Sequence, residues 1–336
     1  MFPARRASRH NSQSLPTVSV VIPAYNAADT IRRALDSVLA QTYEAVTEII
    51  VVDDGSEDET PDFVRANYPD ARVIEQENAG AAAARNTGVA AATGEYVAFL
   101  DDDDEWFPKK TEVQMSCFRK CPGLRMTLTD IVLVKDDRPR PVPSNDAGGD
   151  SGGWLLEPLT FSGCFPTVPF HYGCSGWVFD RALFEECGPF GQLRRRQDRE
   201  WLWRALFLGF SIAFVRRPLY HYYGADFRRT PEERADFARA WYAVLPSVLE
   251  DFAERATEPP ALLSEEEATE KRAEFYRIVA WGLWELDLRD EARTCLTRSA
   301  ELSDARGLKG MRERLAADNP ALYQKLSAIV GFASRG

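Results

Sequence analysis

The sequence predicts an α/β fold with a doubly wound, mostly parallel sheet flanked by helices, followed by an α-helical C-terminal domain. Short apolar runs rich in β-branched residues alternate with amphipathic helical segments over residues 17–224, which is typical of such a sheet. Beyond residue 228 the apolar spacing is helical throughout. We therefore expect a flexible tail over residues 1–16, an α/β domain over 17–224 and a helical domain over 225–336.

The first strand and helix set the pattern. Residues 17–22 are apolar and mostly β-branched, which indicates a strand covered on both faces, and Pro23 ends it. Asn26 or Asp29 is available to cap the helix that follows. The apolar residues of that helix recur with helical spacing at Ile31, Ala34, Leu35, Val38 and Leu39.

The alternation continues along the chain. Further strands are predicted at residues 48–52, 72–74 and 96–100. One helix is predicted to begin at Thr60, with proline in its first turn, and an alanine-rich helix at residues 81–92. Each strand is thus followed by a helix or a short loop, as a doubly wound sheet requires.

The rest of the chain carries a loop and further elements. Residues 135–153 are rich in Pro, Gly, Asp and Ser, which predicts a mobile loop inside the first domain. The later predicted elements are a strand at 176–179, a helix after Asp180, a helix at 198–208, a strand at 211–215, and C-terminal helices at 237–252, 271–286 and 290–302.

Composition excludes several classes of protein. Lys+Arg 41 against Asp+Glu 52 gives a net charge of −11, which argues against a sequence-independent grip on nucleic acid. The six cysteines form no C-x-x-C pair and the three histidines no zinc-ligand cluster, so we expect reduced thiols in a cytoplasmic protein. No apolar run approaches the roughly 20 residues of a spanning helix. We expect no transmembrane segment, and association with the inner face of a membrane stays open.

Polar residues follow three of the predicted strands. The segments Pro23 to Asn26, Asp53 to Ser56 and Asp101 to Asp104 each come directly after a strand. Because ligands of such sheets bind outside the carboxyl ends of the strands, these segments are expected to line one crevice. If the strand geometry continues, Asp101 and Asp103 point to the same side and suit a hard divalent cation. The alternative is a solvated acidic turn.

Four motifs occur in order: Val20-Val-Ile-Pro-Ala-Tyr-Asn26, Val51-Val-Asp-Asp-Gly-Ser-Glu-Asp-Glu-Thr60, Asn78-Ala-Gly-Ala-Ala-Ala-Ala-Arg-Asn86 and Phe99-Leu-Asp-Asp-Asp-Asp-Glu-Trp106. Together they resemble the successive motifs of family 2 glycosyltransferases with the GT-A fold. The resemblance runs from about residue 17 to residue 223 and makes 17–224 the expected catalytic domain. It says little about the sugar.

The resemblance implies a role for each motif residue that contacts the donor. Pro23 and Tyr25 would hold the nucleotide base, Asp54 would hydrogen-bond to the uracil edge, and Arg85 would lie near the ribose or diphosphate. A departing nucleoside diphosphate gains negative charge in the transition state, and a metal ion with Arg85 would stabilise it.

Asp101 and Asp103 match the family's Asp-x-Asp motif. The resemblance implies that this motif binds Mn²⁺ or Mg²⁺, with Asp103 the expected direct ligand, and that the motif also reaches the ribose. Asp102 stands where the family often has a small residue, so which carboxylate faces the nucleotide sugar stays open, and Asp102 is included among its expected contacts.

A later motif supplies the expected catalytic base. Residues 194–204 resemble the family's Glu-Asp motif, with Gln197 replacing Glu and Asp198 standing where the family keeps its base. Asp198 would take the proton from an acceptor hydroxyl as it attacks the anomeric carbon, which inverts the configuration. Two alternatives stay open: Asp198 as a helix cap, and Glu200 as the base. The arginines at 194–196 would bind phosphate or form a solvated turn.

Aromatic residues are candidates for acceptor contacts. An indole face packs well against a pyranose, which makes Trp106, Trp177, Trp201 and Trp203 candidates, with Trp177 preferred and Trp201 the second acceptor contact, although large aromatics more often belong to a core. His221 would approach the metal or form a partly buried hydrogen bond.

The expected function is an inverting, metal-dependent glycosyltransferase. Its donor would be a nucleotide sugar, expected to be a UDP-sugar, and its acceptor a hydroxyl of a saccharide or lipid-linked saccharide. A nucleotidyltransferase or dinucleotide-binding protein would need a Gly-rich loop after the first strand, which is absent. The alternative is a catalytically silent nucleotide-sugar-binding protein whose helical domain recruits a partner. A homodimer formed through that domain stays open.

Overall fold

The structure is a computed structural model that describes residues 15–135, 138–141, 156–158, 173–191, 197–223, 231–257 and 263–302. The chain divides into two compact units, one of Met1–Thr160 and Pro169–Phe227 and one of Phe161–Val168 and Arg228–Gly336. The predicted tail falls largely outside the described residues, and the predicted boundary at 224 and 225 lies outside them as well.

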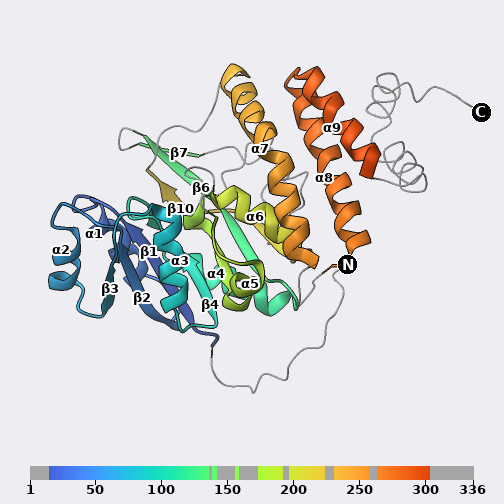
Figure 1. Cartoon of the computed structure of the whole chain (residues 1–336). Coiled ribbons are helices and arrows are strands. Elements are labelled where there is room, and N and C mark those ends of the chain that lie inside the picture. Colours follow the sequence, from blue (N-terminus) through green and yellow to red (C-terminus); the bar gives the residue numbers. More distant parts are fainter. Residues whose placement is uncertain are drawn as a thin grey trace, which may run out of the picture. The chain divides into compact units, whose positions relative to one another are not determined.

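The first unit is built on one sheet (Figure 1). In the described residues its strand order is β3-β2-β1-β4-β9-β6-β10-β5, with β7 paired to β6 and β8 to β10. The strands are β1 Val18–Ala24, β2 Val46–Asp53, β3 Ala71–Glu75, β4 Tyr96–Phe99, β5 Glu105–Trp106, β6 Met126–Lys135, β7 Arg138–Pro141, β8 Leu156–Pro158, β9 Val178–Asp180 and β10 Ile212–Tyr222.

Pairing within the sheet confirms the predicted fold class. β3, β2, β1 and β4 are parallel neighbours, and β6 is parallel to β10. Short antiparallel strands complete the sheet, with β9 between β4 and β6, and β5 on β10. Part of the predicted loop at 135–153 is strand β7, and the rest of it lies outside the described residues.

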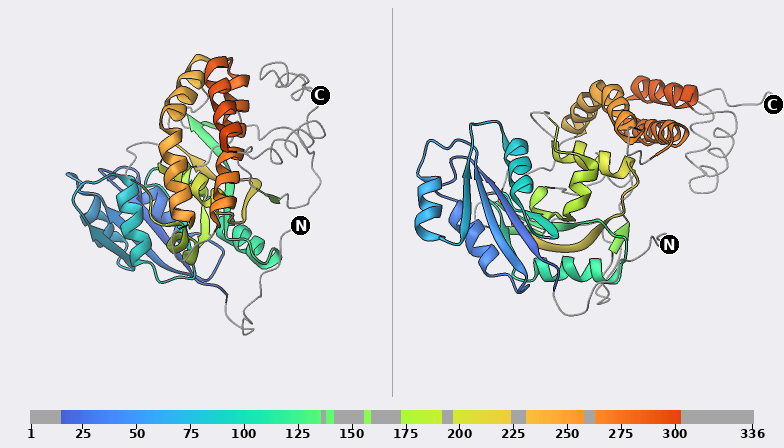
Figure 2. Two further views of the ribbon diagram at one scale, coloured as in Figure 1. Left: turned by 45° about the vertical axis from the view of Figure 1, so that its right-hand side comes forward. Right: turned by 60° about the horizontal axis from the view of Figure 1, so that its bottom comes forward.

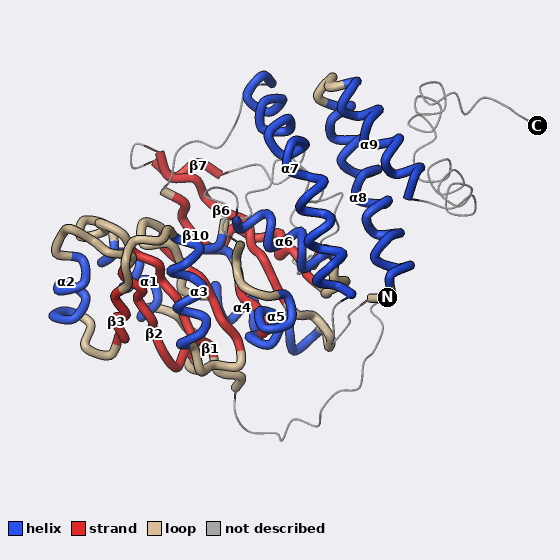
Figure 3. Tube along the Cα trace, viewed as in Figure 1, coloured by secondary structure: helices blue, strands red, loops and turns tan. Residues whose placement is uncertain are grey.

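Helices cover both faces of the sheet (Figures 2 and 3). All seven residues of β1 are buried, and alternate residues face opposite sides. Val20 and Ile22 share a core with α1, whereas Val21 lies against Gly88 of α3 on the other face. The helices of this unit are α1 Ile31–Leu39, α2 Thr60–Asn67, α3 Ala81–Ala91, α4 Lys110–Lys120, α5 Arg181–Cys187 and α6 Gln197–Phe207.

The predicted cap of α1 is wrong. Its N-cap residue is Thr30, and the Thr30 side chain makes no capping hydrogen bond. Asn26 instead adopts a left-handed conformation with φ 49°, and its side-chain oxygen accepts the Glu57 N–H. This bond joins the loops that follow β1 and β2 at the polar edge of the sheet. The start of α1 therefore has no side-chain cap from Asn26.

Gly88 sets how closely α3 approaches β1. A Cβ atom at this position would overlap the Val21 side chain, which is β-branched and buried. We expect Gly88→Ala to lower the free energy of unfolding by about 1–3 kcal/mol, despite the better helix propensity of alanine. Urea denaturation measures this change. Ala90→Ser, at an exposed position of α3, is the control and should change the same quantity by less than about 0.5 kcal/mol.

The second unit is helical in its described residues, as predicted. It comprises α7 Pro231–Thr257, α8 Glu265–Glu285 and α9 Arg289–Leu302. A capping box starts α8, since the Ser264 hydroxyl accepts the Glu267 N–H while the Glu267 carboxylate accepts the Ser264 N–H. Among the described helices of both units, none is long and apolar enough to cross a membrane.

Candidate active site

A pocket of about 300 Å³ opens at the carboxyl ends of β1, β2 and β4 and at the N-terminus of α3. It is lined by Pro23, Ala24, Tyr25, Asp54, Ala81, Arg85, Asp101, Asp102 and Asp103. The structure therefore brings together every residue predicted to contact the donor or the metal. The structure thus confirms that the predicted segments line one crevice. The roles of these residues stay predictions.

Tyr25 gives the pocket an accessible aromatic surface. It is 48% exposed, although it follows a strand that is buried along its whole length. The left-handed turn at Asn26, held by hydrogen bonds to the loop after β2, directs the chain away from the sheet directly after Tyr25. An exposed ring at the mouth of a polar pocket can stack on a planar base.

Asp54 is buried and already holds three hydrogen bonds. One carboxylate oxygen accepts from the Gln76 amide at 2.7 Å and the Ala79 N–H at 3.0 Å, and the other accepts from the Gly80 N–H at 2.7 Å. The Thr87 hydroxyl donates to the side-chain oxygen of Gln76, Oε1, and this bond orients the Gln76 amide. Asp54 thereby fixes the N-terminus of α3 and retains acceptor capacity for one more N–H donor.

Arg85 and Asp101 form the charged centre of the pocket. Arg85 is 6% exposed, and its guanidinium lies 2.5 Å from the Asp101 carboxylate. Burial alone would lower the pKa of Arg85, but the Asp101 carboxylate raises it above its usual value, so Arg85 stays charged. A buried guanidinium facing a pocket is a strong site for a diphosphate.

The acidic run Asp101 to Asp104 forms a turn and does not continue the strand. β4 ends at Phe99, and the Asp104 N–H donates to the Asp101 carbonyl across the turn. The condition for placing Asp101 and Asp103 on one side by strand alternation, that the strand geometry continues, is therefore not met. All three carboxylates Asp101 to Asp103 nevertheless line the pocket, because a turn can present successive side chains to the same space.

Each carboxylate of this turn has a different environment. Asp102 accepts the Tyr25 N–H at 3.1 Å, and burial together with its acidic neighbours raises its pKa to about 7. Burial, and then the Asp101 charge, raises the pKa of Asp103. The Asp103 carboxylate makes no hydrogen bond or ion pair with another described residue, whereas its carbonyl accepts from Arg33 at 2.5 Å. Burial and neighbouring carboxylates thus make the ionised forms of Asp102 and Asp103 less favourable than in free aspartate.

The described residues include no ready-made group of three metal ligands. The donor set nevertheless fits a hard divalent cation, because oxygen ligands from Asp103 and Asp101 face the same pocket and the Asp103 carboxylate is uncommitted. Ions of this kind often bind through one or two carboxylates and complete their shell with water and substrate phosphates.

Two supporting residues of the turn were not predicted. The Ser175 hydroxyl is completely buried, accepts the Asp101 N–H at 3.0 Å and donates to Asp104 at 2.5 Å. Arg33 stacks over the Tyr223 ring at 3.6 Å while it holds the Asp103 carbonyl. Ser175 and Arg33 come from segments distant in sequence, and no local pattern marks either of them.

Asp198 lies in the first turn of α6 and does not line the pocket. It is the second residue of the helix, and its carboxylate accepts the N–H of the next residue, Arg199. Its charge contributes to raising the pKa of Arg85. The predicted base is therefore in the electrostatic range of the pocket. The arginines at 194–196 lie outside the described residues.

Glu200, the alternative base, is buried and forms an ion pair. It is 6% exposed and forms a buried ion pair with Arg204 one turn further along α6, at 3.3 Å. A buried carboxylate committed to a guanidinium is a poor proton acceptor, because protonation would leave the guanidinium unpaired. This environment favours Asp198 over Glu200.

The acceptor platforms predicted at Trp177 and Trp201 are wrong for this structure. Both side chains are completely buried, and their ring centroids lie 5.7 Å apart. Four phenylalanines complete this aromatic cluster, Phe99, Phe179, Phe184 and Phe190. Trp177 and Trp201 are therefore core residues, which is the alternative given above. Trp106 and Trp203 are buried as well.

His221 does not line the pocket. Its Nδ1 lies 2.9 Å from the Glu105 carboxylate, and its ring meets Phe107 edge-on at 4.7 Å. The Tyr223 hydroxyl donates to the same Glu105 oxygen. His221 is therefore a partly buried, hydrogen-bonded residue that helps hold β10 to β5.

The chain is similar to known glycosyltransferases in sequence. Residues 19–188, about half of the chain, match the family model described as Glycosyl transferase family 2. An uncharacterized glycosyltransferase, YibD of Escherichia coli K12, is 46% identical over 102 residues, which cover 30% of this chain and 29% of YibD. The Escherichia coli protein described as UDP-Glc:alpha-D-GlcNAc-diphosphoundecaprenol beta-1,3-glucosyltransferase WfgD is 45% identical over 106 residues, which cover 31% of this chain and 41% of WfgD. The chain thus spans less than half the length of these relatives.

Solved structures share the fold. Staphylococcus aureus TarS 1-349 superposes with a TM-score of 0.55 at 19% identity, covering 87% of this chain and 82% of TarS 1-349. The complex of that protein with UDP superposes with a TM-score of 0.56 at 17% identity, covering 85% and 88%. Its complex with UDP-GlcNAc superposes with a TM-score of 0.51 at 18% identity, covering 84% and 89%.

Proposed function

The chain belongs to glycosyltransferase family 2, and we propose that it transfers a sugar, with inversion, from a UDP-sugar to a hydroxyl of a saccharide or lipid-linked saccharide. The observation that carries this proposal is the pocket that collects an exposed aromatic ring, a buried arginine and four carboxylates at the ends of three parallel strands.

The base end of the pocket suits uracil. Tyr25 offers a ring face, and the Asp54 carboxylate, fixed by Gln76, can accept an N–H such as that at N3 of uracil. WfgD is described as a glucosyltransferase that uses UDP-Glc, and TarS 1-349 has been crystallised with UDP and UDP-GlcNAc. These relatives support UDP as the carrier and leave the sugar unspecified.

The diphosphate end is built from opposite charges. Arg85 can bind the phosphate oxygens without moving far, because it is buried at the pocket wall and held by Asp101. As the bond to the sugar breaks, negative charge grows on the departing diphosphate. A fixed guanidinium that faces this charge stabilises the transition state more than the ground state.

Asp103 and Asp101 would hold Mn²⁺ or Mg²⁺ in this pocket. Such an ion, when bound, would neutralise the phosphate oxygens of the leaving group. The Asp103 carboxylate is the better placed ligand, because Asp101 already pairs with Arg85 and Asp102 accepts the Tyr25 N–H. Burial and like charges disfavour the ionised carboxylates of the turn, and a bound cation would offset that cost.

Asp198 would act as the general base. Its carboxylate would accept the proton of the acceptor hydroxyl while that oxygen attacks the anomeric carbon from the side opposite the diphosphate. A single displacement of this kind inverts the anomeric configuration. The buried, paired state of Glu200 supports Asp198 in this role.

Release of UDP tests the proposal. We expect the protein to release UDP from UDP-glucose or UDP-GlcNAc in the presence of saccharide acceptors, to lose at least about 90% of that rate in EDTA, and to recover it with Mn²⁺ or Mg²⁺. An unchanged rate in EDTA would remove the metal from the proposal. Tight UDP binding without turnover over a broad acceptor panel would instead favour a silent nucleotide-sugar-binding protein.

A further inference from the structure

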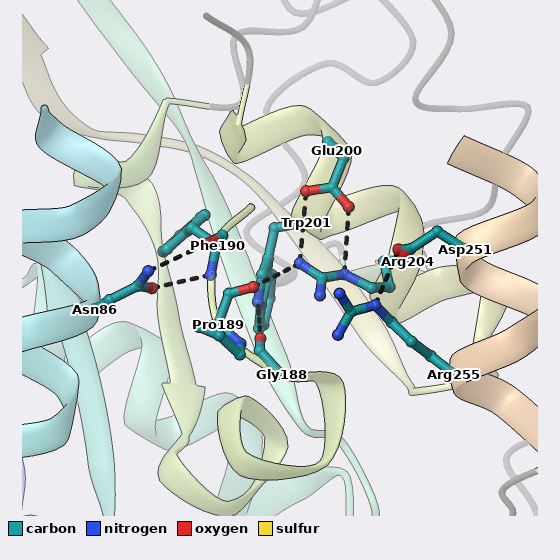
Figure 4. Close-up of polar contacts among 9 residues, drawn as sticks. All are labelled: Asn86, Gly188, Pro189, Phe190, Glu200, Trp201, Arg204, Asp251 and Arg255. Atoms are coloured by element: carbon teal, nitrogen blue, oxygen red, sulfur yellow. Dashed lines mark hydrogen bonds and ion pairs between the residues drawn. The ribbon is translucent and has the colours of Figure 1, made fainter. Parts of the chain in front are cut away.

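Asn86 follows Arg85 on α3, but its side chain binds main chain instead of lining the pocket. Its Nδ2 donates to the Phe190 carbonyl at 3.1 Å, and its Oδ1 accepts the Phe190 N–H at 2.9 Å, across 104 residues of sequence (Figure 4). One amide thus pairs with both main-chain groups of a single residue. This pairing fixes the segment of residues 188–191, here called the 188–191 segment, against α3.

The same segment is anchored to α6 from its other side. The Trp201 indole N–H donates to the Gly188 carbonyl at 2.7 Å, and the Arg204 guanidinium donates to the Pro189 carbonyl at 2.7 Å (Figure 4). Arg204 is itself held by Glu200. The Trp201 and Arg204 side chains are buried, and the two hydrogen bonds that they donate are part-buried.

The 188–191 segment therefore joins α3, which carries Arg85, to α6, which carries Asp198. Trp201 lies three residues after Asp198 and so nearly one turn along the same helix. We propose that Asn86 is a positioning residue that sets the place of Asp198 relative to the donor pocket. The inference rests on the proposed function, because it assigns to Asp198 the role of base.

The chemistry of the Asn86 contact explains why an amide is needed. The Asn86 amide donates to the Phe190 carbonyl through Nδ2 and accepts the Phe190 N–H through Oδ1, which neither a carboxylate nor a methyl group can do. An aspartate would direct a carboxylate oxygen at the carbonyl, and an alanine would leave both main-chain groups unpaired. In each case α6 keeps its own contacts with the segment, but the link to α3 is lost.

Hydrogen exchange and UDP binding test the link without turnover. We expect Asn86→Ala to increase amide exchange at least 10-fold in the 188–191 segment and the first turn of α6, while the Kd for UDP with Mn²⁺ changes less than 2-fold. Asn67→Ala is the matched control, because Asn67 donates to one main-chain carbonyl, that of Phe63, within α2. Unchanged exchange in Asn86→Ala, or a parallel loss of UDP affinity, would overturn the inference.

A double-mutant cycle tests the action through Asp198. In wild-type protein, Asn86→Ala is expected to lower kcat for UDP release from UDP-GlcNAc at least 10-fold with KM nearly unchanged. In an Asp198→Asn background the same change should lower kcat less than 2-fold, since the residue that it positions is gone. Equal effects in both backgrounds would show a merely structural role and overturn the inference.

A second variant makes the test independent of Asn86. Trp201→Phe removes the indole N–H that binds Gly188 and retains most of the ring. It is expected to show the same loss in kcat, the same retention of UDP affinity and the same dependence on Asp198. Full turnover of Asp198→Asn alone would overturn the proposed base together with this inference, whereas a loss in Asp198→Asn without one in Asn86→Ala and Trp201→Phe would overturn the inference alone.

Discussion

Asp198→Asn is expected to lower kcat about 10²- to 10⁴-fold and to leave the Kd for UDP within 2-fold of wild type. The expected fall in kcat corresponds to the usual contribution of a general base. The Kd for UDP should change little because Asp198 lies outside the donor pocket. Asparagine keeps the shape and can still accept the Arg199 N–H. Steady-state kinetics with UDP-GlcNAc and calorimetric titration with UDP measure the two quantities.

The control for charge at a helix start is Asp62→Asn. Asp62 also lies in the first turn of its helix, α2, but its side chain is 86% exposed and forms an ion pair with Arg65 of that helix. Its replacement should change kcat less than 2-fold. Wild-type turnover in Asp198→Asn would show that another group takes the proton.

Glu200→Gln separates the two carboxylates of α6. Removal of one partner of the buried Glu200 and Arg204 pair should lower the free energy of unfolding by about 3 kcal/mol, because a buried guanidinium is left uncompensated. A variant as stable as wild type but inactive would identify Glu200 as the base and contradict the assignment to Asp198.

Asp103→Asn is expected to abolish the dependence on metal. Turnover with Mn²⁺ should fall about 100-fold or more, to the level that wild-type protein shows in EDTA, because several kcal/mol of charge stabilisation on the leaving group are lost. Asp103 has this effect because its carboxylate is free of other described partners and lines the pocket. A titration of UDP release against Mn²⁺ measures it.

Asp102→Asn is the control within the same turn. Its replacement can still accept the Tyr25 N–H, so turnover should fall less than about 10-fold and Mn²⁺ dependence should persist. If Asp102→Asn removed the dependence on Mn²⁺ and Asp103→Asn retained it, the assignment of Asp103 as the metal ligand would be wrong and Asp102 would be the ligand.

The sequence predicted the donor pocket because its signals are local. Each polar segment directly follows a strand, and the topology of parallel strands places their carboxyl ends together. Tyr25, Asp54 and the acidic turn therefore meet where the alternation of strands and helices says they should. Arg85 lies within a helix, and only the resemblance to a known family predicted its place in this pocket.

The errors concern contacts between distant segments. No sequence pattern around Trp177 or Trp201 distinguishes a ring that contacts a sugar from a ring in the core. Their complete burial in the structure shows that both belong to the core. At the turn where strand alternation ends, the Asp101 N–H donates to the hydroxyl of Ser175, 74 residues later in the chain. Asn86 lay within a predicted motif, yet its partner Phe190 could not be named before the fold was known.

The most direct test of the account is a crystal structure of the protein with UDP and Mn²⁺, with the metal located by anomalous scattering. We expect one Mn²⁺ at about 2.0–2.2 Å from an Asp103 carboxylate oxygen, the range of Zn²⁺ and Mg²⁺ bonds to oxygen ligands. The diphosphate should lie between this ion and Arg85, and the uracil should lie beside Tyr25 and Asp54. UDP bound away from these residues, or Mn²⁺ with no contact to Asp101 or Asp103, would contradict the assignment of the donor site.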